Sequence, residues 1–357
     1  MKIGIVTQPL ATNYGGILQN YALQQVLKKL GHEVWTIDYN RFNWLDWADN
    51  AWRVLVHKML GHDVKFAPAP EVRRQKEAPL RKFVHDHISL TVPRTKKFSS
   101  RILDKYSFDA VVVGSDQVWR PIYNYDVADC FLKFAGSRPM LKVAYAASFG
   151  TSGWELSARQ TAECARLVKS FKGVSVRELS GIKLCREHLD ADAVNVLDPT
   201  LLLHAEDYTS LCRNVPKHEP FVFAYILDGS EAIRNTVKSF AESKGLPYFV
   251  KSAGANVGPD DSVESWLSYF RDARYVITDS FHGTVFSIIF NKEFVVLGNE
   301  QRGNSRFDSL LDILGLEGRM ISRLNQTKSD NIDWKAVNAR REESIAYSVE
   351  WLKHTLR

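Results

Sequence analysis

The chain has 357 residues, of which 45% are hydrophobic and 25% charged, and this composition excludes disordered, collagen-like and coiled-coil proteins. The length is about twice that of a usual single domain and predicts two domains. No apolar run approaches the roughly 18 residues that a membrane-spanning helix needs, so we do not expect an integral membrane protein. The N-terminal segment lacks a signal-peptide pattern and predicts a cytoplasmic protein.

The net charge of +6 is concentrated in one segment, because residues 41–107 hold 14 Lys and Arg against 7 Asp and Glu. Trp44, Trp47 and Trp52 lie in the same segment. Aromatic rings combined with positive charge are typical of surfaces that contact anionic lipid head groups, so we expect a peripheral membrane contact here. The alternative is a charged helical insertion whose Trp rings pack inward. No nucleic-acid-binding motif accompanies the charge, and we expect no nucleic-acid partner.

The first half of the chain alternates short apolar strands with helical stretches. A Gly-containing loop and a helix over residues 17–30 follow the first strand, which is a βαβ start. Such an alternation predicts a parallel sheet covered by helices. The predicted strands are residues 2–7, 33–37, 108–113, 142–146, 173–176 and 193–197.

The sequence Asp198-Pro199-Thr200 interrupts this pattern, which restarts after a polar stretch at residues 213–220. The second half predicts strands at residues 221–226, 248–250, 275–278 and 293–297, separated by helices at 230–244, 262–272 and 283–290. We therefore expect an α/β protein with two Rossmann-like, doubly wound domains that face a central cleft at the carboxyl ends of both sheets. The predicted domains are residues 1–205, which include the basic insertion, and residues 206–330. A last helical stretch at residues 331–357 is expected to pack back across the domain junction.

The cysteines give no indication of a metal centre, since they lie at gaps of 34, 21 and 27 residues without a C-x-x-C pair or a nearby His at ligand spacing. We expect all of them to be reduced and buried as small hydrophobic residues. They are Cys130, Cys164, Cys185 and Cys212.

Two polar loops follow strands in the first predicted domain. Asn13-Tyr14-Gly15-Gly16 opens a helix, and its glycines allow a ligand to approach the backbone closely; a tight turn explains them equally well. Ser115-Asp116-Gln117 and Trp119 follow the next strand. A carboxylate and an amide can bind sugar hydroxyls while an indole stacks on a sugar face. The alternative is that Ser115 and Asp116 only cap the next helix.

Two further loops bring basic residues to strand ends. Arg177 ends the strand at residues 173–176, where its guanidinium can hold a carboxylate or phosphate. The alternative is an ion pair with Glu178 or with a carboxylate across the sheet. His282 lies in a strand-to-helix turn, a place where anions bind and where imidazole can exchange a proton near neutral pH. His282 is therefore our candidate general acid and base, against the alternative of a structural histidine.

With these loops identified, the chain resembles the polysaccharide pyruvyl transferase family, with matches from residue 3 to about residue 320. Residues 41–107 and the C-terminal tail match the family little. The matching motifs lie in family order at residues 3–7, 13–23, 114–119, 144–150, 175–178, 197–202 and 278–284.

The resemblance implies a fold like the two-domain glycosyltransferase-B type and transfer of pyruvate from phosphoenolpyruvate to two sugar hydroxyls as a cyclic ketal. The acceptor would belong to a bacterial surface polysaccharide or its polyprenyl-linked precursor. By the same resemblance, Arg177, Ser280, Phe281 and Gly283 would form the donor site around His282. Several family members carry an Arg at the position of Ser280, so the donor clamp here needs another cation. The candidates are Arg177, Lys251, Arg302 and Arg306.

In this hypothesis His282 is the acid and Asp116 orients or deprotonates an acceptor hydroxyl. No metal and no cofactor is expected beyond phosphoenolpyruvate as co-substrate. Two alternatives stay open, namely a nucleotide-sugar glycosyltransferase of similar fold and a non-catalytic glycan-assembly protein. The expected acceptor contacts are Asn13, Tyr14, Gln19, Ser115, Gln117 and Trp119.

Overall fold

The structure is a computed structural model that describes residues 1–39, 70–124, 126–252, 261–298, 304–321 and 331–357. Trp44, Trp47 and Trp52 of the basic segment lie outside the described residues, so the membrane contact predicted there stays a prediction. No helix in the described part of the chain is both long and apolar enough to cross a membrane.

The first domain is built on a six-stranded sheet in the order β2-β1-β3-β4-β5-β6, and every neighbouring pair is parallel. Its strands β3 and β4 are almost entirely buried, as expected of a parallel sheet with helices on both faces. The strands are β1 (Lys2–Val6), β2 (Glu33–Thr36), β3 (Ala110–Gly114), β4 (Leu141–Ala147), β5 (Gly173–Val176) and β6 (Val194–Asn195). Its helices are α1 (Tyr14–Lys29), α3 (Pro70–His87), α4 (Ser100–Tyr106), α5 (Ala158–Val168) and α6 (Leu179–Leu189).

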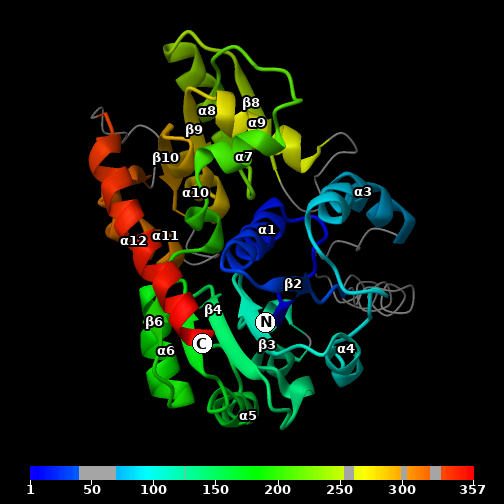
Figure 1. The fold of residues 1–357 in the computed structure, drawn as a ribbon. Helices are drawn as coiled ribbons and strands as arrows, with labels where there is room; N and C mark the ends of the chain where they lie inside the picture. Colours follow the sequence, from blue (N-terminus) through cyan, green and yellow to red (C-terminus); the bar gives the residue numbers. More distant parts are fainter. Residues whose placement is uncertain (40–69, 125, 253–260, 299–303, 322–330) are drawn as a thin grey trace, which may run out of the picture.

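The second domain is built on a five-stranded parallel sheet in the order β11-β10-β9-β7-β8 (Figure 1). The short strand β11 was not predicted from the sequence. The strands are β7 (Val222–Tyr225), β8 (Tyr248–Lys251), β9 (Tyr275–Thr278), β10 (Glu293–Leu297) and β11 (Met320–Ile321). The helices are α7 (Ala205–Leu211), α8 (Glu231–Ser243), α9 (Val263–Asp272), α10 (Phe281–Ile289) and α11 (Ser305–Leu314).

The expected fold class of two parallel-sheet, Rossmann-like α/β domains is confirmed by these two sheets. The boundary predicted at residues 205 and 206 falls between β6 and β7, and its exact position stays a prediction. All four cysteines are buried and free of disulfides, as expected.

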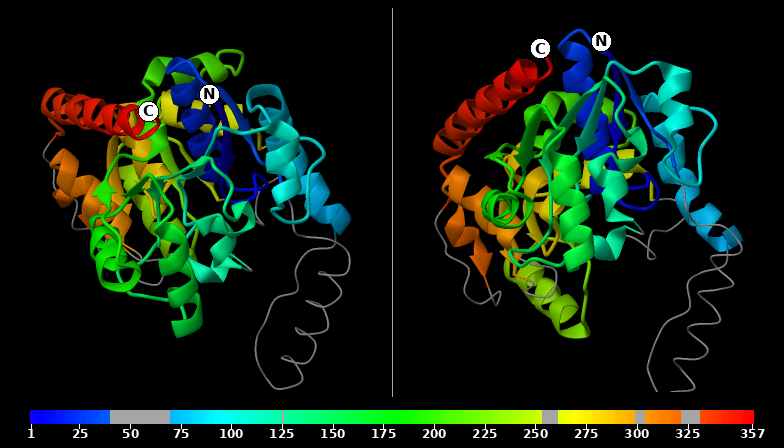
Figure 2. Two further views of the ribbon diagram at one scale, coloured as in Figure 1. Left: turned by 60° about the horizontal axis from the view of Figure 1, so that its bottom comes forward. Right: turned by 90° about the horizontal axis from the view of Figure 1, so that it is seen from below.

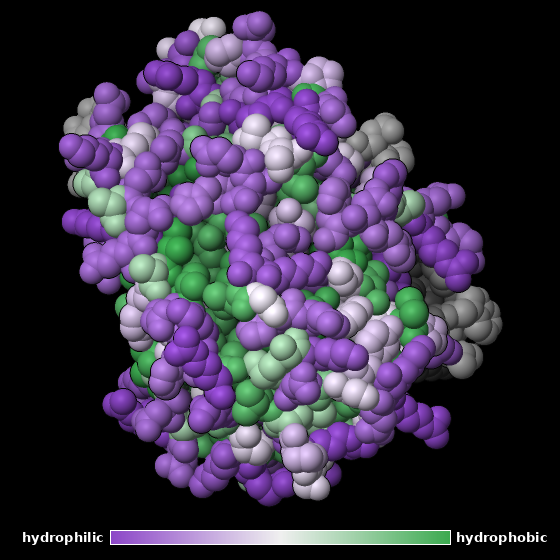
Figure 3. All heavy atoms as spheres, in the orientation of Figure 1, coloured by the Kyte–Doolittle hydropathy of each residue, from purple (hydrophilic) through white to green (hydrophobic). Residues whose placement is uncertain are grey.

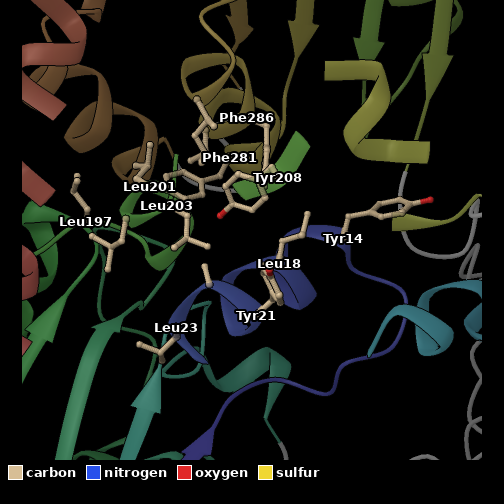
Figure 4. Packing of buried hydrophobic residues seen from close by; sticks show 14 of the residues in the cluster. Tyr14, Leu18, Tyr21, Leu23, Leu197, Leu201, Leu203, Tyr208, Phe281 and Phe286 are labelled. Atoms are coloured by element: carbon tan, nitrogen blue, oxygen red, sulfur yellow. The ribbon is translucent and has the colours of Figure 1, made fainter. Parts of the chain in front are cut away.

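One apolar core runs through both domains, and this fixes how the domains face each other. It joins residues of α1, such as Leu18, to residues of the second domain, such as Phe286. Figure 4 shows Tyr208 and Phe281 lying above Leu18 and Tyr21, so the amino-terminal part of α1 faces α10 across the junction. Because burial of these side chains stabilises both domains together, the loops at the two sheet ends are held in one arrangement.

The C-terminal helix α12 (Trp334–Thr355) bridges the two domains and returns the chain to the first one (Figures 1 and 2). The buried Arg341 guanidinium donates hydrogen bonds to the carbonyls of Leu201 and Leu203 in the connection between the sheets. Ser348 Oγ accepts a hydrogen bond from the backbone N–H of Leu197. Figure 3 shows hydrophobic side chains gathered beside this helix, in the middle of the face where the domains meet.

Candidate active site

The site is centred where the N-termini of α1 and α10 meet across the two domains. Ser280 caps α10, because its Oγ accepts a hydrogen bond from Gly283 N at 3.3 Å, so the helix begins at Phe281 and not at Gly283 as expected. His282 therefore lies in the first helical turn and is 7% exposed. Its ring rests directly on Gly15, since a Cβ added to Gly15 would lie 2.0 Å from His282 Nδ1. Only glycine at position 15 leaves room for the imidazole.

A buried carboxylate, Asp198, organises the interior of the site. Its Oδ2 accepts hydrogen bonds from Arg177 Nη1 and Ser115 Oγ, both at 2.8 Å, while its Oδ1 accepts one from Thr200 Oγ1. His282 Nε2 lies 3.7 Å from the same Oδ2. Burial alone would raise the pKa of Asp198, but His282, Arg177 and Thr200 together hold that pKa well below its usual range. Asp198 therefore stays ionised and orients Arg177.

Two arginines lie near the ring of Phe281. The Arg177 guanidinium carbon lies 4.5 Å from the ring centroid and that of Arg306 lies 5.7 Å away. Burial, together with the charge of Arg177, lowers the pKa of Arg306 to about 10. Within the described ranges, Arg177 Nε and Nη2 are buried without a hydrogen-bond partner. Buried guanidinium N–H groups are normally hydrogen-bonded, and a carboxylate or phosphate is a suitable acceptor for them.

The cations considered for the place of the arginine that several family members carry at position 280 lie in different surroundings, and the choice among them stays a prediction. Arg306 joins Arg177 at Phe281, whereas Lys251 forms an ion pair with Asp261. Arg302 lies outside the described residues. The Ser280 side chain caps α10. Gly283 packs closely on Thr278, because a Cβ added to Gly283 would lie 2.2 Å from Thr278 Oγ1.

Asp116 lies beside this cluster in a conformation that ordinary residues avoid. Its backbone has φ 71°, and the side chain accepts a hydrogen bond from Gln117 N at 2.8 Å. Its Oδ1 is 4.0 Å from Arg177 Nη2, and its Oδ2 lies against Gly16 at the start of α1. Strained backbone held by its surroundings is common at functional residues. The candidate residues Asp116, Arg177 and His282 therefore come together in one site.

The expected acceptor contacts on α1 are each engaged by protein groups. Asn13 Oδ1 caps the helix by accepting a hydrogen bond from Gly16 N at 3.1 Å. The Tyr14 ring stacks on Trp266 of the second domain, with centroids 5.3 Å apart. The Gln19 side-chain amide donates to Thr7 Oγ1 and Gly16 O, deep in the interior.

The expected acceptor contacts that follow β3 also contact other side chains of the protein. Ser115 binds Asp198, and Gln117 Oε1 accepts a hydrogen bond from Arg120 Nη1 at 3.3 Å. Trp119 is fully buried, with its ring stacked on Phe131 at 4.6 Å. Sugar binding by the acceptor contacts stays a prediction, and the Trp119 indole face is covered by protein.

The sequence interpretation assigned no site role to two carboxylates, although it named Glu178 as a possible ion-pair partner of Arg177. In the sequence, Asp198 marks an interruption of the strand pattern and belongs to a family motif. It also stands directly after a predicted strand end. Glu178 is fully buried, and its Oε1 accepts hydrogen bonds from Ser148 Oγ, Phe149 N and Gly150 N. Its second oxygen, Oε2, has no partner among the residues described. A strand-end position is the signal that would have found both.

In the described segments, no group of three or more His, Cys, Asp or Glu side chains lies close enough together to bind a metal ion. The expectation of a metal-free site stays a prediction.

Several solved structures are similar to this chain at low identity. UDP-GlcNAc 2-epimerase from Neisseria meningitidis bound to UDP-GlcNAc is 10% identical with a TM-score of 0.47, covering 100% of this chain and 99% of its own. The Methanocaldococcus jannaschii epimerase in complex with UDP-GlcNAc and UDP is 12% identical with a TM-score of 0.43, over 97% and 100%. An O-GlcNAc transferase mutant from Thermobaculum terrenum is 12% identical with a TM-score of 0.39, over 100% and 63%.

The sequence comparisons decide the family. No curated protein matches the chain. The family model described as polysaccharide pyruvyl transferase matches residues 13–301, which include the helix start at Gly15, the Arg177 strand end, Asp198 and the His282 turn. The chain belongs to the polysaccharide pyruvyl transferase family.

Proposed function

We propose that this protein transfers pyruvate from phosphoenolpyruvate onto two hydroxyls of a sugar in a bacterial surface polysaccharide or its lipid-linked precursor. The observation that carries the proposal is the buried Arg177, which shares the carboxylate oxygen Asp198 Oδ2 with His282 and whose Nε and Nη2 have no hydrogen-bond partner in the described part of the chain. Membership of the family supports the reaction class.

The donor is a small, doubly anionic molecule that suits this interior. Arg177 and Arg306 supply guanidinium groups for its carboxylate and phosphate, and the first turn of α10 supplies the positive end of a helix dipole. Asp198 holds Arg177 in place from the opposite side at 2.8 Å. The site therefore offers fixed positive charge where the donor's negative charge would lie.

In the proposed reaction, His282 gives a proton to C3 of phosphoenolpyruvate, which makes C2 electrophilic. One acceptor hydroxyl adds to C2 and passes its proton to Asp116. The bond between C2 and the phosphate oxygen then breaks, and the second hydroxyl adds to C2 to close the ketal. Of the two hydroxyl protons, one replaces the proton that His282 gave and one leaves on phosphate, so the enzyme is regenerated. Its contribution is positioning and charge stabilisation.

The test is a thermal-shift titration with phosphoenolpyruvate, with UDP-GlcNAc as the competing candidate. Ligand binding raises the melting temperature by mass action, and we expect this with phosphoenolpyruvate alone. Arg177→Lys and Arg306→Lys keep the positive charge but lose the planar fork, so both should weaken the shift. Stabilisation by UDP-GlcNAc and not by phosphoenolpyruvate would replace the proposal with a nucleotide-sugar enzyme.

We also propose that the reaction takes place at the cytoplasmic face of the membrane, through the basic segment 41–107. The charge and aromatic content of that segment support this. The test is sedimentation with anionic lipid vesicles after neutralising the Lys and Arg residues between 73 and 97. Unchanged binding by a folded variant would contradict the proposal.

A further inference from the structure

A cavity of about 730 Å³ opens between the two domains, next to the cluster of arginines. Its walls are the N-terminal turn of α6 in the first domain and α11 in the second, and Leu179 N donates a hydrogen bond to Ser309 Oγ across the gap at 2.9 Å. The volume lies within the range of about 300–1,000 Å³ that is usual for small-molecule sites. The cavity is therefore large enough for a ligand.

The cavity adjoins the proposed reaction centre along both walls. On one wall, Arg177 and Glu178 directly precede Leu179 and Ser180, which line the cavity. On the other wall, Ser305 lines the cavity while the next residue, Arg306, faces Phe281. The cavity-lining residues are thus the immediate chain neighbours of the two arginines proposed to hold the donor.

The lining of the cavity includes several polar residues. Thr151 and Ser152, which lie before α5, and Ser309 of α11 also line the cavity and carry hydroxyl groups. The residues that precede the two helices, Glu178 and Asn304, form no side-chain cap. Lining hydroxyls suit a ligand rich in hydroxyl groups, because each hydroxyl both donates and accepts a hydrogen bond.

The charge of the lining decides between an uncharged and an anionic ligand. Three exposed carboxylates, Asp308, Asp312 and Glu317, stand among the lining residues, and none of the described lining residues is Lys or Arg. Carboxylates accept hydrogen bonds from sugar hydroxyls, whereas they repel a nucleotide diphosphate. The apolar Leu179, Leu311 and Met320 add surface for the C–H face of a sugar ring.

We propose that the cavity between α6 and α11 is the acceptor site and that it binds an uncharged sugar ring. This rests on the proposed function, because the ring would be modified by the neighbouring donor. It assigns the acceptor to a surface other than the buried loop that ends at Trp119.

The test is saturation-transfer NMR with the methyl glycosides of glucose, galactose, mannose and N-acetylmannosamine, in the presence of phosphoenolpyruvate. We expect at least one glycoside to give a signal with the wild type. Ser305→Trp, which fills the cavity, and Asp312→Trp, which covers its mouth from an exposed position, should lose that signal. Ser239→Trp, at an exposed position of α8 outside the cavity, is the matched control and should keep it.

The stabilisation by phosphoenolpyruvate, measured on the same proteins, separates the two proposals. If it is absent from the wild type, the proposed function fails. If it persists and the glycoside signal survives in both cavity variants, the cavity is not the acceptor site. Displacement of the glycoside by UDP, or no glycoside signal from the wild type, overturns the proposal as well.

Discussion

The contact between Gly15 of the first domain and His282 of the second gives the sharpest prediction. A Cβ at Gly15 would lie 2.0 Å from His282 Nδ1, whereas ordinary contact begins at 3.4 Å, so the ring would have to move by about 1.4 Å. Gly15→Ala should therefore destabilise the protein by about 1–3 kcal/mol, the usual cost of overpacking. In a His282→Ala background the space is empty, and the same change should be neutral or stabilise α1 by up to about 1 kcal/mol, because alanine favours helix.

The assay is chemical denaturation of the wild type, both single variants and the double variant, which gives the coupling free energy of a double-mutant cycle. Gly153→Ala is the control, because an added Cβ there has nothing within 4 Å and its effect should add independently of His282. If Gly15→Ala costs the same free energy in both backgrounds, the packing argument is refuted. In an activity assay, a displacement above 1 Å should also slow transfer by about 100-fold.

Three further predictions concern the interior of the site. Asp198→Asn leaves the buried Arg177 without its counter-charge and should cost roughly 3–5 kcal/mol in denaturation experiments; an unchanged midpoint would contradict this. Folding lowers the pKa of Asp198, so its ionised form stabilises the folded protein fully above the unfolded pKa of about 3.9. This stabilisation is lost as the pH falls below that value. The melting temperature of the wild type should therefore fall more steeply below about pH 4 than that of Asp198→Asn. Trp119→Ala removes a fully buried ring and should cost about 3–5 kcal/mol while leaving the shift with phosphoenolpyruvate intact; loss of that shift would give Trp119 a role in donor binding.

The sequence predicted the elements well where hydrophobic periodicity is strong. Strands β5, β9 and β10 lie at the predicted residues, and β1 ends one residue earlier than predicted. The predicted start of α10 at Gly283 is wrong, because Ser280 caps the helix and it begins two residues earlier, at Phe281. Capping depends on a local hydrogen bond that periodicity does not report.

Some of the site residues could likewise be predicted from the sequence, and others could not. Arg177 and His282 stand out in the sequence because strand-end loops face a cleft, and the structure brings them together. Trp119 stands at a similar loop, yet its ring is packed in the core, since the sequence pattern does not say which side of the backbone the indole occupies. Asp198 was overlooked, because its role depends on neighbours that are distant along the chain.

By itself, the sequence determined two parallel α/β domains and the strand ends at which polar groups collect, because both follow from local periodicity and from the direction of parallel strands. Only the tertiary structure decided which of those loops meet. The shared apolar core sets Gly15 of one domain against His282 of the other, and parallel pairing of β5 with β6 sets Arg177 beside Asp198. These distances depend on how the sheets and domains pack, which no short stretch of sequence encodes.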